Sequence, residues 1–120
     1  MNKTFLLVGA LAAFLAVALG AFGAHGLRNR LSPEMLGVFE TAVRYQMYHA
    51  LALLLVSLMM GATGGWAIRA AGWAFTAGIV LFSGSLYLLA ITGTSTFGAI
   101  TPIGGLAFLV GWACVIVAGL

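Results

Sequence analysis

Four long apolar runs follow one another along the chain, and they constrain its fold more than any other feature. We place them at roughly Phe5–Ala24, Val43–Met60, Ala70–Ile91 and Pro102–Leu120. A helix needs about 20 apolar residues to cross a hydrocarbon core of about 30 Å, and each run comes close to that length. The sequence therefore predicts an all-α, polytopic membrane protein with four transmembrane helices, in which residues 1–120 form a single domain.

The small number of charged residues supports this prediction. Hydrophobic residues make up 63% of the chain and charged residues 6%, where a soluble domain carries about 25% charged residues. So few ionic groups cannot cover a globule, and most of the surface must face the lipid bilayer. The net charge of +3 comes from cations that occur singly, whereas nucleic-acid binding needs a clustered basic face. We therefore expect lipid contacts and no nucleic-acid partner.

The first apolar run also resembles a secretory signal peptide, because Lys3 precedes it and small residues occur near Gly20. We interpret it as a retained first helix. Small residues recur in this run at four-residue steps, a pattern that lets a neighbouring helix approach closely in a membrane. They are Ala12, Ala16, Gly20 and Ala24. The neighbour belongs either to the same chain or to a second copy, and we favour the same chain.

A polar stretch separates the first two runs and predicts a short amphipathic helix at the membrane interface. Ser32, Pro33 and Glu34 are typical of a helix start, with an N-cap, a proline in the first turn and a carboxylate near the positive end. Apolar residues then recur at helical spacing. This interfacial helix is either separate from the second span or continuous with it. Further on, Thr101–Pro102 resembles a second helix start, and we expect the fourth span to begin there.

Polar residues gather toward one side of the predicted bundle. We call side B the side on which the first span ends and the second begins, and side A the opposite one. The candidate polar pocket on side B consists of His25, Arg44, Gln46, His49, Ser83, Ser85, Tyr87 and Thr101. Each has a structural explanation as well: Arg44 can extend to the headgroups beside Glu40, serines can bond to their own helix or across to a neighbouring one, and tyrosines populate the interface.

His49 is the strongest single candidate, because ionisable groups inside a span usually face the bundle interior. Consecutive spans are antiparallel, so His25 could lie at a similar depth and face it. Two facing imidazoles can ligate haem or a soft metal, which makes cofactor binding a third and weaker hypothesis. Without a further ligand motif we expect no cofactor. The sequence contains no Asp, its two Glu lie in the interfacial segment, and no catalytic motif occurs, so we predict a non-enzymatic protein.

Several motifs together resemble a known family. They are Gly20–Leu27 (GAFGAHGL), Tyr45–Leu51 (YQMYHAL), Leu81–Tyr87 (LFSGSLY) and Thr101–Gly105 (TPIGG). This set, which extends over essentially the whole chain, is similar to a family of small, uncharacterised bacterial inner-membrane proteins with mitochondrial relatives in eukaryotes. The resemblance implies four membrane helices and a multi-pass location in the bacterial inner (plasma) membrane. It implies no activity.

Two functional hypotheses remain. In the first, the polar pocket on side B binds or passes a small molecule or ion. In the second, the chain is an accessory or oligomer-forming subunit of a larger membrane complex, and a packing face points outward. The distribution of Lys and Arg slightly favours side B as the cytoplasmic side, since side B carries three arginines and side A carries Lys3 and Arg69.

Overall fold

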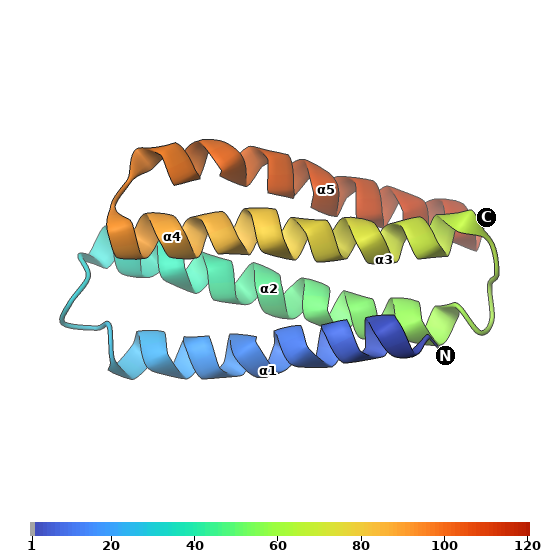
Figure 1. The fold of residues 1–120 in the computed structure, drawn as a ribbon, viewed down its shortest axis with the longest axis horizontal. Helices are drawn as coiled ribbons and strands as arrows, with labels where there is room; N and C mark the ends of the chain where they lie inside the picture. Colours follow the sequence, from blue (N-terminus) through green and yellow to red (C-terminus); the bar gives the residue numbers. More distant parts are fainter. Residues whose placement is uncertain (1) are drawn as a thin grey trace.

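The computed structural model describes residues 2–120 and contains four long antiparallel helical rods (Figure 1). Helix α1 spans Lys3–His25 and α2 spans Pro33–Met59. The third rod is built from α3 (Trp66–Gly78), a π-helical turn η1 (Ile79–Ser83) and α4 (Gly84–Thr92), and the fourth is α5 (Ser95–Gly119). All four are long and apolar enough to cross a membrane.

The two middle rods form the centre of the bundle. Helix α2 packs along the whole α3–η1–α4 rod, while α1 packs mainly on α2 and α5 mainly on α3 and η1. Figure 1 accordingly shows α1 and α5 at opposite edges, and it shows both chain termini at the same end. That end is side A, so the connection between α1 and α2 lies on side B.

The interfacial segment is the beginning of α2 and not a separate helix. The side chain of Ser32 caps it by accepting a hydrogen bond from the backbone N–H of Met35 over 3.2 Å, as the sequence predicted. Phe39 is buried against α1, whereas Glu34 and Glu40 are exposed. At 1.5 Å per residue this helix is about 40 Å long, so its first turns extend beyond a hydrocarbon core of about 30 Å.

The prediction that the fourth span begins at Thr101–Pro102 is wrong. Helix α5 begins at Ser95, and Pro102 lies inside it. A proline in a helix removes one backbone hydrogen bond, and membrane helices tolerate this when neighbouring groups compensate. The third rod likewise begins earlier than predicted, at Trp66. Both helices therefore include interfacial residues that the apolar runs did not contain.

Phenylalanines that fit onto glycines hold the outer helices against the middle ones. Phe108 of α5 covers Gly78 of α3, and Phe75 of α3 covers Gly111 of α5, so that a Cβ atom on either glycine would overlap the ring. At the other edge, Phe5 of α1 is 2% exposed and covers a glycine of α3 in the same way. Close approach of this kind supplies the van der Waals contact on which membrane helix association depends.

The small-residue pattern of α1 faces the chain's own α2. Ala12 and Ala16 are buried, and a Cβ atom on Gly20 would lie 3.3 Å from Val43. Ala24, the last member, is exposed. Most of the pattern therefore serves packing within the chain.

Candidate functional site

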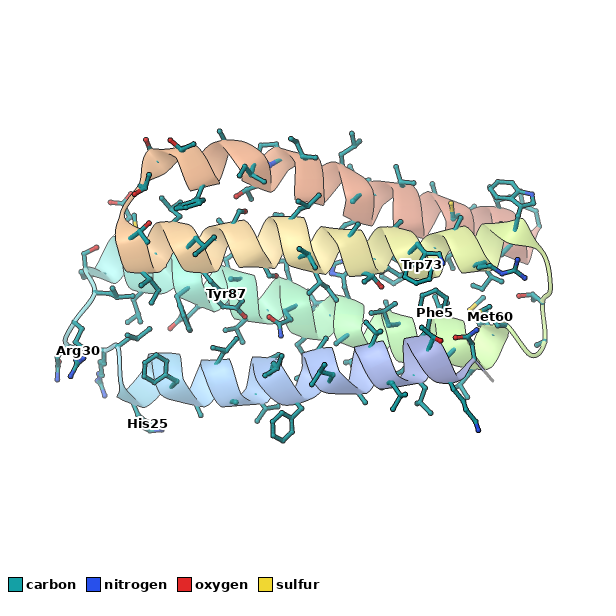
Figure 2. All side chains as sticks on the ribbon, in the orientation of Figure 1. Phe5, His25, Arg30, Met60, Trp73 and Tyr87 are labelled. Atoms are coloured by element: carbon teal, nitrogen blue, oxygen red, sulfur yellow. The ribbon has the colours of Figure 1, made fainter. Side chains whose placement is uncertain are left out.

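Gln46, at the middle of α2, ties three helices together. Its amide nitrogen donates to the backbone carbonyl of Ala12 on α1 over 2.8 Å. Its amide oxygen accepts from the hydroxyl of Tyr87 on α4 over 2.7 Å. Figure 2 shows Tyr87 reaching from α4 into the space between α1 and α2. Gln46 is 5% exposed, so water cannot replace either bond. The first bond fixes the position of α1 against α2, and the second fixes that of α4.

Hydroxyl groups join the remaining helices. The hydroxyl of Ser83, in the π-helical turn, donates to the carbonyl of Ala42 on α2 over 2.8 Å. The hydroxyl oxygens of Ser85 on α4 and Thr101 on α5 lie 2.7 Å apart and share a hydrogen bond. Ser83 is completely buried. The extra residue in a π-helical turn changes which side chains face a neighbouring helix. Here the turn ends at Ser83, the residue that bonds to α2.

His49 lies where α2, α3 and α5 converge. The indole nitrogen of Trp112 on α5 lies 3.1 Å from Nε2 of His49, and Nδ1 lies 2.8 Å from the carbonyl of Tyr45. Because an indole N–H can only donate, Nε2 must accept, and the ring proton must sit on Nδ1 and be donated to Tyr45. The imidazole also stacks on Phe108 at 3.6 Å between ring centroids. This arrangement describes a neutral imidazole with both nitrogens bonded.

The buried polar groups therefore satisfy one another. Within residues 2–120, every buried side-chain nitrogen or oxygen has a hydrogen-bond partner. Unpaired polar groups in a low-dielectric interior cost free energy, and a fully paired set stabilises a unique packing. Six predicted pocket residues form hydrogen bonds between helices, namely Gln46, His49, Ser83, Ser85, Tyr87 and Thr101.

His25 and Arg44 do not join this set. His25 ends α1 and points away from the other helices in Figure 2. Gly23, two residues before it, packs against Phe39, and ten residues of α2 separate Phe39 from His49, a rise of about 15 Å. The facing histidine pair of the third hypothesis is therefore not formed, because the antiparallel helices place His25 near the end of the bundle and His49 near its middle.

Arg44 lies on the outside of α2. Its guanidinium is 3.6 Å from the carboxylate of Glu40, and its side chain is 63% exposed. This exposed position beside Glu40 agrees with the structural explanation of Arg44 given in the sequence analysis, an ion-paired side chain that can extend to the headgroups. Among the residues described, no group of three or more His, Cys, Asp or Glu could hold a metal ion.

A groove between α2 and α5 lies beside His49. It encloses about 570 Å³ and is open along one side. Aromatic rings form most of its wall, together with residues on one face of α5; the lining comprises Tyr45, His49, Phe82, Pro102, Gly105, Leu106, Phe108, Leu109 and Trp112. Ligand sites in proteins have this size and a predominantly apolar and aromatic lining with few polar groups. We call it the aromatic groove.

Sequence reasoning missed the contribution of α5 to this site. Trp112 and Phe108 were assigned no role, although an indole inside a span needs an acceptor for its N–H. That requirement was a usable signal. The position of Gly105 was not predictable, because an apolar run does not reveal which face of its helix turns toward α2.

Comparison with known proteins assigns the chain to a family. Residues 19–105 match the model of a family described as "Protein of unknown function (DUF423)". The chain belongs to the DUF423 family. The UPF0382 membrane protein YwdK of Bacillus subtilis is 50% identical over 117 residues, which cover 97% of this chain and 95% of the relative. A UPF0382 membrane protein of Staphylococcus epidermidis is 50% identical over 121 residues, covering 98% and 96%. No solved structure matches.

These relatives confirm the resemblance seen in the sequence motifs and establish the chain as a membrane protein of an uncharacterised family. A third relative, from Staphylococcus saprophyticus, is 51% identical over 118 residues and is also named a UPF0382 membrane protein. None of these names states an activity. Function within the DUF423 family must therefore be argued from the site itself.

Proposed function

We propose that this DUF423 protein is a non-enzymatic binding protein of the bacterial inner (plasma) membrane that takes an amphiphilic small molecule from the bilayer into the aromatic groove. The observation that carries the proposal is the groove itself, a hollow of about 570 Å³ beside the stacked pair of His49 and Phe108. A lipid-facing opening suits a ligand that is already dissolved in the membrane.

The lining supports an amphiphile in preference to an ion. Nearly all of the groove wall is apolar, and its length along α5 runs from Pro102 to Trp112, about 15 Å at 1.5 Å per residue. An acyl or isoprenoid chain fits such a trough. At the edge of the groove, Tyr45 is 39% exposed, so its hydroxyl can hydrogen-bond to the polar end of the ligand.

The surrounding chemistry favours binding over catalysis or ion passage. Neither Glu lines the groove, and the sequence has no Asp, so no carboxylate stands ready as a general acid or base. His49 uses both ring nitrogens in hydrogen bonds. A proton relay through it would have to break one of them.

The inner-membrane location rests on the bacterial relatives, which are named membrane proteins, and on the four apolar helices. Fractionation of bacterial membranes tests it. We expect the protein to sediment with an inner-membrane marker in a Gram-negative host, and its recovery with outer-membrane markers would contradict the assignment.

A substitution that fills the groove tests the binding function. A Cβ atom on Gly105 would lie 3.8 Å from the ring of Phe82, an ordinary contact, so Gly105→Leu should occupy the groove without displacing α5. Gly119→Leu is the matched control, because nothing lies within 4 Å of that position. Native mass spectrometry of protein purified in mild detergent should show bound amphiphile in the wild type and the control but not in Gly105→Leu.

The alternative occupant is a helix of another protein chain, as expected of an accessory or oligomer-forming subunit. In that case the wild type carries no small molecule, and Gly105→Leu lowers the mass of the complex measured by light scattering while the monomer stays folded. That result would replace the binding function with the subunit function.

A further inference from the structure

A second, smaller groove lies between α1 and α2 toward side B. It encloses about 260 Å³. Small residues of α1 form one wall, and α2 contributes apolar side chains and a charged edge; the lining comprises Gly20, Gly23, Ala24, Phe39, Glu40, Val43 and Arg44. Unlike the aromatic groove, it therefore combines an apolar floor with one anionic and one cationic group.

The charged edge lies at the level of the lipid headgroups. A hydrocarbon core of about 30 Å corresponds to about 20 helical residues. Counted back from Met59, the side-A end of α2, that length reaches Glu40. Glu40 is therefore at the boundary, and Arg44, one turn deeper, extends its guanidinium back toward it. The apolar floor then lies at the depth of the first acyl-chain carbons.

Glu40 and Arg44 are only loosely engaged with each other. Their charged atoms are 3.6 Å apart, and the side chains are 54% and 63% exposed, respectively. An exposed pair at this separation contributes little free energy. Each group therefore keeps most of its capacity to bind a second partner of opposite charge.

We propose that this groove binds one phospholipid with an ethanolamine headgroup. The lipid phosphate accepts hydrogen bonds from the guanidinium of Arg44, and the primary ammonium donates to the carboxylate of Glu40. The four charges then alternate in sign, which is the complementary arrangement of two zwitterionic pairs. One acyl chain lies in the apolar part of the groove, between α1 and the side chains of Phe39 and Val43.

The same chemistry discriminates against other headgroups. A choline headgroup is cationic but carries no N–H, so it cannot donate a hydrogen bond to Glu40. A phosphatidylglycerol headgroup offers the phosphate and two hydroxyl groups but no cation, so the lipid supplies no counter-charge to Glu40. Arg28 and Arg30, in the neighbouring connection on side B, act alike on the two zwitterionic lipids and so do not contribute to the preference for ethanolamine over choline.

The test is lipid competition on the intact protein. Wild-type protein is placed in an equimolar mixture of phosphatidylethanolamine, phosphatidylglycerol and phosphatidylcholine with identical chains, and retained lipids are counted by native mass spectrometry. We expect the ethanolamine lipid to be enriched about fivefold over the choline lipid, the factor that corresponds to one hydrogen bond. Retention of the three lipids in equal proportion would overturn the proposal.

Two charge-neutralising variants separate the roles of the pair. Glu40→Gln should lose the preference for the ethanolamine lipid over phosphatidylglycerol, and Arg44→Gln should lose retention of both. Glu34→Gln is the matched control, since this exposed carboxylate on the same helix lies outside the groove. Unchanged selectivity in Glu40→Gln, or equal loss in the control, would overturn the assignment. Because all of these side chains are exposed, the variants should fold, and a melting curve checks that they do.

Discussion

Trp112 of α5 donates its indole N–H to Nε2 of His49 on α2 over 3.1 Å. This single bond fixes the tautomer of the histidine, since the remaining ring proton must then be donated from Nδ1 to the carbonyl of Tyr45. It also joins the outer helix α5 to the centre of the bundle across the inner wall of the aromatic groove. His49 and Trp112 therefore belong both to the buried hydrogen-bonded groups and to the wall of the aromatic groove.

The bond between Trp112 and His49 predicts a non-additive pair of substitutions. Trp112→Phe keeps an aromatic ring but leaves a buried imidazole nitrogen without a donor, and we expect a loss of about 1 kcal/mol in stability. Adding His49→Phe removes the unpaired group, so the double variant should recover most of the loss. Unfolding in SDS followed by circular dichroism measures both. Strictly additive losses would show that the two side chains do not interact.

Gln46 should be the most sensitive polar residue of the interior. Gln46→Leu leaves the hydroxyl of Tyr87 without its acceptor, and we expect a cost of about 1–3 kcal/mol. Tyr87→Phe should cost less, because Gln46 keeps its bond to Ala12. Tyr48→Phe is the control at an exposed position and should leave the unfolding curve unchanged. A fully stable Gln46→Leu would mean that this network does not stabilise the fold.

Two neighbouring glycines of α5, Gly104 and Gly105, should differ in how well they tolerate substitution by alanine. A Cβ atom on Gly104 would overlap the backbone at Phe82, whereas one on Gly105 meets only the Phe82 ring at ordinary contact distance. Gly104→Ala should therefore push α5 away from the π-helical turn and lower the melting temperature and yield. Gly105→Ala should be tolerated. Equal behaviour of the two variants would contradict the packing of α5 described above.

The depth of polar residues was predictable from the sequence, but their direction was only partly so. Counting residues from the ends of apolar runs placed Gln46, Ser83 and Tyr87 in the side-B half of the bundle, and in the structure hydrogen bonds join each of them to another helix. The same count failed for His25, because the second apolar run begins near Val43 whereas α2 itself begins at Pro33. Arg44 was placed at the right depth, but its side chain points outward.

Helix boundaries show the same limit in another form. The apolar runs located all four spans, yet α5 begins at Ser95, well before the expected start at Pro102. Hydropathy reports which residues suit a lipid environment and does not report backbone hydrogen bonding. An apolar run therefore omits the polar residues that extend a helix by a turn or two at its end. The contacts of Phe75 with Gly111 and of Phe108 with Gly78 also escape one-dimensional analysis, because each depends on which helices are neighbours.

The distribution of arginine and lysine residues predicts a membrane orientation. Arg28, Arg30 and Arg44 are on side B, and Lys3 and Arg69 are on side A, which slightly favours side B as cytoplasmic. Both chain ends lie on side A (Figure 1). A phosphatase fused after Leu120 should therefore be active outside the cytoplasm and a fluorescent protein fused there should stay dark. The reverse pattern would contradict this orientation.

Occupancy of the aromatic groove is measured most directly by the fluorescence of Trp112, which lines it. Replacing Trp66 and Trp73 by Phe leaves Trp112 as the only fluorescent tryptophan, and a stearic acid bearing a nitroxide group serves as the probe. We predict saturable quenching at low probe content in a bilayer of fixed composition, and its loss in Gly105→Leu. Quenching that rises linearly with probe content, and equally in both proteins, would show that Trp112 meets only bulk lipid and would contradict the binding function.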